Sequence, residues 1–263
     1  MSDFLDVLAR DAKATVESGY YNHPAKTVAP RVSLRNAILR CRHMPIIAEV
    51  KSASPSAGVI KESFDAKEIA AAMARGGACG ISVLTEPKHF NGSLSNLASV
   101  RKTVRLPVLM KDIVVNTTQL DAASSLGANA VLLIQAVYDR GYGEISVDKM
   151  IEEAHNRQLE VLLEAHSESE FRQALTSDAD LLGINNRNLG TLEVDLNVTK
   201  HIMERNPLPR MLVVSESGIQ NPDDIRFLAQ CGANAFLIGS AIMSAADVED
   251  KTRKFTMAHS PRK

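Results

Sequence analysis

Two distant stretches of the chain share one pattern: Leu126-Gly127-Ala128-Asn129-Ala130-Val131-Leu132-Leu133-Ile134 and Cys231-Gly232-Ala233-Asn234-Ala235-Phe236-Leu237-Ile238-Gly239. A looser copy, Gly77-Ala78-Cys79-Gly80, precedes a third apolar run. In each copy we expect a helix to end at a glycine that can adopt positive φ, and a buried strand to begin two residues later. Such repeated units are typical of a parallel sheet, either closed as a barrel or open and doubly wound.

Outward from these copies, short apolar runs alternate with longer amphipathic segments. The runs are rich in Val, Ile and Leu, as expected for parallel strands covered on both faces. They predict strands at 45–51, 80–85, 106–112, 128–135, 160–164, 180–185, 211–216 and 235–239. Helical patterns lie between them, for example at 66–75, 117–126, 147–156, 168–175 and 222–230. Eight strands within 263 residues favour an α/β fold, a single (β/α)8 TIM barrel.

The segments at the two ends differ from this repeat. Residues 1–44 precede the first strand, and Ser2 is positioned to cap a helix that carries Leu5 and Leu8. We expect an N-terminal helical extension packed on the barrel (1–44), a catalytic barrel (45–247) and a charged C-terminal tail (248–263).

Composition excludes several classes of function. Thirty Lys and Arg against 31 Asp and Glu give a net charge of -1, so no basic excess indicates nucleic acid or an anionic membrane. No apolar run approaches the ~20 residues that span a bilayer, and none follows the N-terminus, so we expect a cytoplasmic protein. The three cysteines and seven histidines are dispersed without metal-ligand spacing, and we assign no metal. We expect a monomer.

Polar side chains gather where the predicted strands end, which is where TIM barrels place their active sites. The set comprises Glu49, Lys51, Lys111, Asp112, Glu164, Asn185, Asn186, Arg187, Ser215, Glu216 and Ser217. Any one of these can be a stabilising ion pair or a strand-end residue that reaches water. Charges that converge on a low-dielectric cleft must pair or shift their pKa values, which is how acids and bases become useful near neutral pH. Together they predict an active site.

Serine and glycine pairs after the last two predicted strands indicate a binding site for an anion. Ser217-Gly218 follows the seventh predicted strand, and Gly239-Ser240 follows the eighth at the start of a predicted short helix, 241–245. Glycines let backbone N–H groups approach an anion, and the loops after strands 7 and 8 hold the phosphate of many barrel substrates. Ser54, in the loop after the first strand, is a third candidate contact. We therefore expect a phosphorylated small-molecule substrate.

The ordered set of strand-end motifs resembles the indole-3-glycerol-phosphate synthase family. The resemblance runs from about 45 to 243 and rests on Ile46-Ile47-Ala48-Glu49-Val50-Lys51, Ser54-Pro55-Ser56, Ile81-Ser82-Val83-Leu84-Thr85, Phe90-x-Gly92-Ser93, Pro107-Val108-Leu109-x-Lys111-Asp112, Glu160-Val161-Leu162-Leu163-Glu164-Ala165-His166, Gly183-Ile184-Asn185-Asn186-Arg187-Asn188-Leu189 and Ser215-Glu216-Ser217-Gly218-Ile219. Each motif alone is weak, but the ordered set is highly specific.

The resemblance implies a reaction of tryptophan biosynthesis. 1-(2-Carboxyphenylamino)-1-deoxyribulose 5-phosphate becomes indole-3-glycerol phosphate with loss of CO2 and water, and no organic cofactor or metal is implied. Association with other enzymes of the pathway stays open.

Roles for individual residues also follow from the resemblance. It makes Lys111 the acid of ring closure, Lys51 the contact of the substrate carboxylate, and Glu164 the acid and base of later proton transfers. It further implies that Glu49 holds Lys51, that Asn185 and Arg187 orient substrate, that Glu216 sits among the catalytic polar groups, and that the phosphate is held by Ser54, Ser217, Gly218, Gly239 and Ser240.

This chain departs from the family pattern beside the strand-3 lysine. Many members have Arg before it and Phe after the following Asp, where this chain has Met110 and Ile113. An aromatic side chain there would stack on the anthranilate ring, whereas Ile113 offers only apolar contact, so we expect weaker ring packing. Ala57 stands where Lys is frequent, which makes the strand-1 loop less basic.

Other functions remain open on the residues alone. A Schiff-base aldolase with Lys51 or Lys111 as nucleophile fits the same fold, as does a sugar-phosphate isomerase. A barrel that binds phosphate without catalysis is a third alternative.

Overall fold

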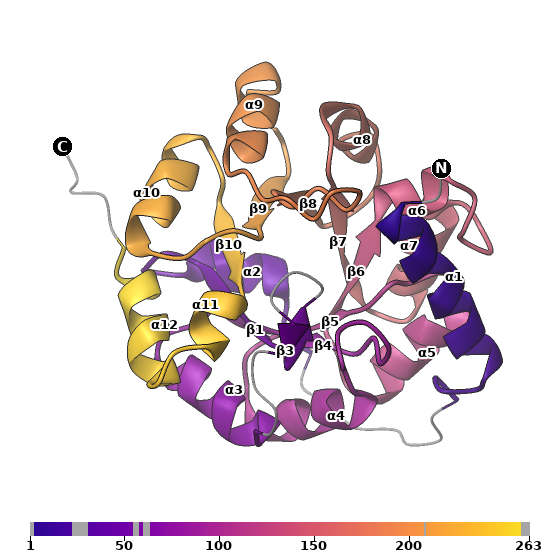
Figure 1. Ribbon diagram of the computed structural model, residues 1–263, viewed down its shortest axis with the longest axis horizontal. Coiled ribbons are helices and arrows are strands. Elements are labelled where there is room, and N and C mark those ends of the chain that lie inside the picture. Colours follow the sequence, from indigo (N-terminus) through magenta and orange to yellow (C-terminus); the bar gives the residue numbers. More distant parts are fainter. Residues whose placement is uncertain (1–2, 23–30, 55–57, 60–63, 208, 259–263) are drawn as a thin grey trace.

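A computed structural model describes residues 3–22, 31–54, 58–59, 64–207 and 209–258. Eight parallel strands close into a barrel, and helices surround them (Figure 1). Around the barrel the strands follow chain order from β4 to β10, and β1 pairs with both β4 and β10. The predicted (β/α)8 TIM barrel is confirmed.

Each predicted strand is present, with ends that differ by a residue or two. The barrel strands are β1 (Ile46–Val50), β4 (Gly80–Leu84), β5 (Val108–Lys111), β6 (Ala130–Ile134), β7 (Glu160–Ala165), β8 (Leu181–Asn185), β9 (Leu212–Glu216) and β10 (Ala235–Ile238). A short antiparallel hairpin, β2 (Ala53–Ser54) and β3 (Gly58–Val59), follows β1 and was not predicted.

The outer ring consists of α3 (Ala66–Arg75), α4 (Leu94–Thr103), α5 (Thr117–Ser125), α7 (Val147–Asn156), α8 (Glu168–Ala174), α9 (Asn197–Arg205), α10 (Pro222–Gln230) and α12 (Val248–Thr256). The bounds of α3, α7 and α10 are those predicted. Two short helices, α6 (Gln135–Asp139) and α11 (Ser240–Met243), follow β6 and β10; α6 begins at the next residue and α11 after Gly239. Among the described residues no helix is long and apolar enough to cross a membrane.

The alternation of side chains along each strand decides what faces the site. On β1, Ala48 and Val50 pack with the outer helices, whereas Ile47 belongs to a separate cluster inside the barrel. Leu109, Leu162, Val214 and Leu237 belong to that same inner cluster. Two positions after each of these five apolar residues, and therefore on the same face, stand Glu49, Lys111, Glu164, Glu216 and Gly239, respectively. The apolar layer therefore forms the floor on which the polar side chains stand.

The N-terminal extension contributes two helices. Helix α1 (Phe4–Glu17) begins at Asp3, whose side chain accepts a hydrogen bond from the Asp6 backbone N–H, so our prediction of Ser2 as the cap is wrong. Arg140 Nη1 pairs with Asp3 at 2.7 Å and with Asp6 at 2.8 Å, which fixes α1 beside α6 (Figure 1).

Helix α2 (Leu34–Arg40) lies at the end of the barrel where the strands begin, and it was not predicted. The Glu160 carboxylate, at the start of β7, accepts the Leu34 backbone N–H at 2.6 Å. The Leu34 side chain also lies against Gly80, the first residue of β4. The helix thus covers the end where the strands begin.

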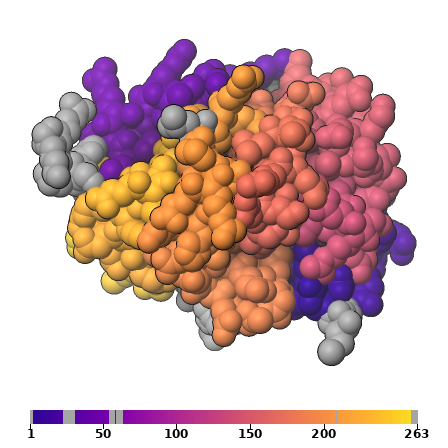
Figure 2. Space-filling view, turned by 90° about the horizontal axis from the view of Figure 1, so that it is seen from above, coloured from indigo at the N-terminus to yellow at the C-terminus, as the bar shows by residue number. Residues whose placement is uncertain are grey.

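The outer ring continues past residue 247, where we expected a charged tail. Phe255 on α12 is fully buried, and Thr252 packs against Gly76 at the end of α3. Figure 2 shows the orange and yellow C-terminal segments as a continuous outer wall. Residues 259–263 lie outside the described part of the chain.

Candidate active site

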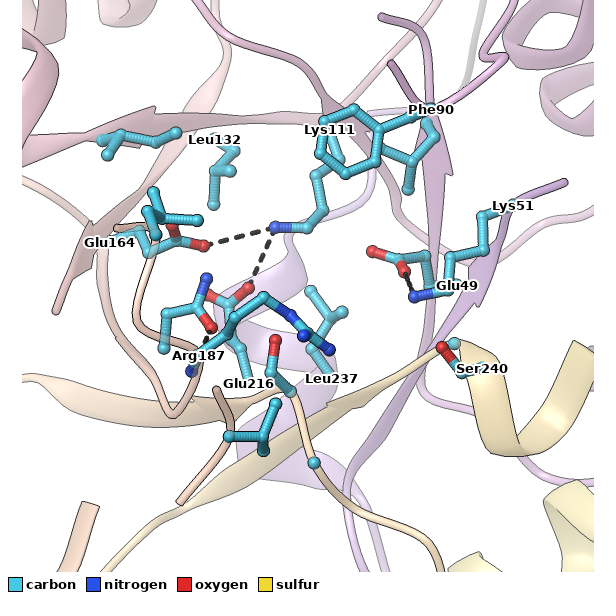
Figure 3. A pocket seen from close by; sticks show the side chains of 18 of the residues that line it. Glu49, Lys51, Phe90, Lys111, Leu132, Glu164, Arg187, Glu216, Leu237 and Ser240 are labelled. Carbon is cyan, nitrogen blue, oxygen red and sulfur yellow. Dashed lines mark hydrogen bonds and ion pairs between the residues drawn. The ribbon is translucent and has the colours of Figure 1, made fainter. Parts of the chain in front are cut away.

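A cavity of about 410 Å³ opens at the carboxyl ends of the barrel strands (Figure 3). The predicted site residues that line it are Glu49, Lys51, Phe90, Lys111, Asp112, Ile113, Glu164, Asn185, Arg187, Glu216, Ser217, Gly218, Gly239 and Ser240. Asn186 and Ser215 of the predicted strand-end set do not line it, but are buried and joined by a hydrogen bond of 3.0 Å. Ser54 lies on β2, and its side chain is outside the described part of the structure. Residues from distant parts of the chain therefore meet in one cavity.

Lys111 lies between two buried carboxylates. Its Nζ is 3.1 Å from Oε2 of Glu216 and 3.3 Å from Oε2 of Glu164 (Figure 3). Burial alone would lower the pKa of Lys111, but Glu164, Glu216 and Glu49 raise it above the ordinary lysine value. The residue is therefore an ammonium, able to donate a proton into the cavity.

The two carboxylates differ in their pKa. Burial would raise the pKa of Glu164, but Lys111, His166 and a hydrogen bond from Asn185 hold it well below its usual range. Burial and the neighbouring Glu164 raise the pKa of Glu216, which outweighs the effect of Lys111. Two coupled carboxyls, whose pKa values are shifted in opposite directions, thus flank the same ammonium, an arrangement typical of sites that transfer protons.

A second ion pair lies across the cavity. Lys51 Nζ is 3.0 Å from Oε1 of Glu49, and Figure 3 shows this pair apart from the Lys111 cluster. The other oxygen of Glu49 is buried without a hydrogen-bond partner among the described residues. Gly239 lies so close to both side chains that a Cβ there would be 2.8 Å from Lys51 Cε.

Arg187 and Asn185 come from the end of β8 and the loop after it. The Asn185 side chain accepts the Arg187 backbone N–H at 3.0 Å, and Nη1 of Arg187 donates to the Leu192 carbonyl at 2.8 Å. The rest of the guanidinium faces the cavity (Figure 3). An arginine held in this way presents a planar set of donors to a carboxylate or phosphate.

The loops after β9 and β10 form the part of the cavity suited to an anion. Ser217 and Gly218 both have positive φ, of 66° and 86°. Successive residues in unusual backbone regions turn N–H groups toward one side, a geometry that binds anions. Gly239 precedes α11, and Ser240 begins it. The expected short helix thus starts one residue earlier than predicted.

The rest of the cavity wall is apolar. Besides the predicted Phe90 and Ile113, it includes Leu84, Leu132, Ile134, Leu189, Leu192, Val194, Ile219, Leu237 and Ile238. Phe4 and Leu8 of α1 also line the cavity, and sequence reasoning missed them. Their spacing of four residues on one helix face was the available signal. A flat aromatic group fits such a wall.

Asp112, the residue after Lys111, ties the N-terminal extension to β5. Tyr21 donates its hydroxyl to the Asp112 carboxylate at 2.9 and 3.0 Å, and the Thr85 hydroxyl also binds it. Burial raises the pKa of Asp112 to about 7, although these donors act in the opposite direction. Within the described ranges, the hydroxyl of the neighbouring Tyr20 hydrogen-bonds to backbone groups of Thr85 and Leu94. The extension thereby docks next to the Lys111 cluster.

This arrangement argues against one alternative function. A lysine that forms a Schiff base must lose its proton to attack a carbonyl, and the enzymes that use one lower its pKa. The two carboxylates beside Lys111 have the opposite effect. Lys111 is therefore placed as a proton donor and not as a nucleophile.

Comparison with known proteins identifies the relatives of this chain. The profile of the family "Indole-3-glycerol phosphate synthase" matches residues 6–255. The indole-3-glycerol phosphate synthase of Methanocaldococcus jannaschii is 41% identical over 231 residues, which cover 86% of this chain and 84% of that protein. The Burkholderia ambifaria (strain MC40-6) enzyme is 38% identical over 254 residues, 93% and 95% of the two chains.

A solved structure with the same fold belongs to a protein of another name. Thiamine phosphate pyrophosphorylase from Pyrococcus furiosus superposes with a TM-score of 0.62, covering 86% of this chain and 97% of that one. The two sequences are 21% identical, so this likeness bears on the fold alone.

Proposed function

The chain belongs to the indole-3-glycerol phosphate synthase family, and from this premise we propose how its own residues carry out the reaction. The enzyme is a decarboxylating carbon–carbon lyase of tryptophan biosynthesis. It converts 1-(2-carboxyphenylamino)-1-deoxyribulose 5-phosphate to indole-3-glycerol phosphate, with release of CO2 and water.

The phosphate end of the substrate lies at the loops after β9 and β10. The backbone N–H groups around Gly218 and Gly239 and the hydroxyls of Ser217 and Ser240 hold it, with Ser54 as a further contact from the β2 hairpin. Glycine at 239 leaves room for the Lys51 and Glu49 side chains beside this loop, because a Cβ there would collide with both. The proposal rests on the positive φ values at 217 and 218 and on their place in the barrel.

The anthranilate end lies against the apolar wall. Phe90 and Ile113 contact the ring, and Phe4 supplies a second aromatic side chain from outside the barrel. The ring carboxylate is bound by Lys51 and oriented by Arg187. The ribulose chain then crosses the cavity above Lys111, which brings its C2′ carbonyl to the ammonium.

Lys111 starts the chemistry as a general acid. When the ring carbon that bears the carboxylate attacks C2′, the carbonyl electron pair moves to oxygen, which takes a proton from Nζ. Loss of CO2 then restores the aromatic ring. In the second half the C2′ hydroxyl leaves as water after protonation by Lys51, and Glu164 accepts the proton lost from C1′. Glu216 keeps Lys111 in place, and Glu49 does the same for Lys51.

One observation carries this assignment: the Lys111 ammonium lies between two buried carboxyl groups, 3.3 Å from Glu164 and 3.1 Å from Glu216. Such a group remains an acid at neutral pH and can be reprotonated by its neighbours between turnovers.

The test is the appearance of indole fluorescence after addition of the carboxyphenylamino-deoxyribulose phosphate. We expect the wild type to turn over, Lys111→Met to lose at least about 10³-fold in kcat and Glu164→Gln about 10²-fold or more. Lys149→Met, which removes an exposed lysine of α7 paired with Glu152 at 3.5 Å, is the control and retains full activity. A wild-type enzyme without product, or a fully active Lys111→Met variant, would refute the proposal.

A further inference from the structure

His166 is a buried ionisable residue that the mechanism above does not use. It follows β7 directly, before the N-terminal cap of α8, and its side chain is 11% exposed. Nε2 lies 3.2 Å from Oε1 of Glu164, and Nδ1 lies 3.5 Å from Oε2 of Glu170. The imidazole is thus enclosed by two carboxylates. It is not among the residues that line the cavity.

The two oxygens of Glu164 face different cations. Oε2 points to Lys111, and Oε1 points to His166. Glu216 also faces Lys111, but its Oε1 is buried without a hydrogen-bond partner among the described residues. Lys111 Nζ lies at nearly the same distance from both carboxylates, 3.3 Å from Glu164 and 3.1 Å from Glu216, and so does not distinguish between them. The ion pair with His166, whose ring nitrogens make no hydrogen bond within the described part of the chain, therefore distinguishes Glu164 from Glu216.

We propose that His166 is a positioning residue: as an imidazolium held between Glu164 and Glu170, it keeps Glu164 ionised and aimed at Lys111. The inference rests on the proposed role of Glu164 as the base of the later proton transfers. Without the second cation, Glu164 and Glu216 would compete for the single ammonium and share the proton. His166 thus assigns the proton to Glu216 and the negative charge to Glu164.

Local structure holds His166 in this place. The Glu170 carboxylate accepts the His166 backbone N–H at 2.8 Å through Oε2, and Oε1 accepts the Ser167 hydroxyl at 3.0 Å. Glu170 is thereby fixed at the first turn of α8, where a negative charge is favoured. Burial would lower the pKa of His166, but the two carboxylates raise it to about 9. The charged groups that face His166 are Glu164 of β7 and Glu170 of α8. Lys111 of β5 and, through Lys111, Glu216 of β9 lie next to Glu164.

The first test is the pH dependence of kcat in His166→Gln, which keeps polar atoms but not the positive charge. We expect the acidic limb of the profile to move up by about one pH unit, because Glu164 loses a cation that lowers its pKa. At pH 7 kcat falls about tenfold because Glu164 is no longer aimed at Lys111, while KM changes less than about twofold, since His166 does not line the cavity. His155→Gln, which removes an exposed histidine paired with Asp180 at 2.9 Å, leaves profile and rates unchanged.

The second test does not depend on turnover. NMR titration of labelled imidazoles, with the His166 signal assigned from its loss in His166→Gln, should show this histidine titrating above the others. In Glu170→Gln and in Glu164→Gln the same signal should titrate at lower pH. A His166 that titrates near the ordinary value, or an unshifted profile in His166→Gln, would overturn the proposal. If the wild type makes no indole product, the proposed function fails, and the titrations still decide whether His166 and Glu164 are coupled.

Discussion

Gly183 on β8 lies directly against the Glu216 carboxylate on the neighbouring strand β9. A Cβ at position 183 would overlap Oε1 of Glu216 and come within 3.3 Å of the Glu164 Cα. The missing side chain therefore makes the space in which Glu216 reaches Lys111. A backbone position on one strand thus controls the placement of an acid on the next.

Gly183→Ala should displace the Glu216 carboxylate from Lys111. We expect kcat to fall about tenfold or more, because a misplacement of 1 Å in catalytic groups is costly, while the barrel still folds. Steady-state kinetics and an unfolding curve measure the two effects. The exposed Gly190, whose nearest contact for a Cβ is the Asn188 side chain at 3.2 Å, is the control position. Equal kcat values for Gly183→Ala and wild type would show that Glu216 tolerates the shift.

Tyr21→Phe should destabilise the protein in a pH-dependent way. Its hydroxyl donates to Asp112, whose pKa is raised to about 7, so the acceptor is ionised above that pH and neutral below it. A hydrogen bond to a charged group contributes about 1.5–3 kcal/mol and one to a neutral group about 1 kcal/mol. The loss in free energy of unfolding should therefore be larger at pH 8.5 than at pH 5.5. Tyr20→Phe, which loses only bonds to backbone groups, should show the same loss at both pH values.

Phe4→Ala should weaken substrate binding, although residue 4 lies outside the barrel. Phe4 lines the apolar side of the cavity, and its loss leaves the anthranilate ring with less contact on that side. We expect KM to rise about tenfold, equivalent to about 1.4 kcal/mol, with a smaller change in kcat. Val7→Ala on the same helix removes a side chain that is 37% exposed and outside the cavity, and its KM should stay at the wild-type value.

Ile113→Phe should tighten binding of the ring. Ile113 lines the same wall as Phe90, and an aromatic side chain at this position adds about 0.5–1.5 kcal/mol of stacking beyond its apolar area. We expect KM to fall several-fold. An increase in KM would mean that Phe4 and Phe90 already fill the available space, and the departure at position 113 would then be a compensation for Phe4.

Strand periodicity was enough to predict much of the site. Because Ile47, Leu109 and Leu162 face the barrel interior, the polar residues two positions further along had to face the same cavity. The pairing of charges could not be predicted, since the sequence does not tell which carboxylate Lys111 meets. That depends on β5, β7 and β9 being brought to one level by the stagger of the closed barrel.

The contribution of the N-terminal extension was also beyond the sequence. Phe4 and Leu8 show a helical spacing, but the place where α1 docks depends on the pairing of Asp3 and Asp6 with Arg140, 137 and 134 residues further along the chain. The N-terminus of α2 is stabilised by Glu160 on β7, a contact between distant parts of the chain that no local pattern reveals. The positions of α1 and α2 on the barrel thus depend on contacts between residues far apart in the sequence, which local patterns do not reveal.

Lys111→Met should cost stability as well as activity. It leaves the buried Glu164 and Glu216 carboxyls without their shared ammonium, and breaking a buried ion pair in this way costs about 3–5 kcal/mol. In the variant, burial and mutual repulsion raise the pKa of these carboxyls above the unfolded value. A raised carboxyl pKa gives stability that is fully present at acid pH and is lost as the pH rises. In the wild type the lowered pKa of Glu164 acts in the opposite direction.

The difference in free energy of unfolding between wild type and Lys111→Met should therefore be large at pH 8 and should shrink toward pH 5. Urea unfolding at the two pH values measures it. Lys149→Met removes one partner of an exposed pair, for which we expect a change below about 1 kcal/mol at either pH. A difference between wild type and Lys111→Met that is independent of pH would mean that the carboxyls of the variant are neutral at both pH values. Ionised Glu164 and Glu216 would then not be the source of the instability of the variant, contrary to the wild-type geometry in which Lys111 pairs with both.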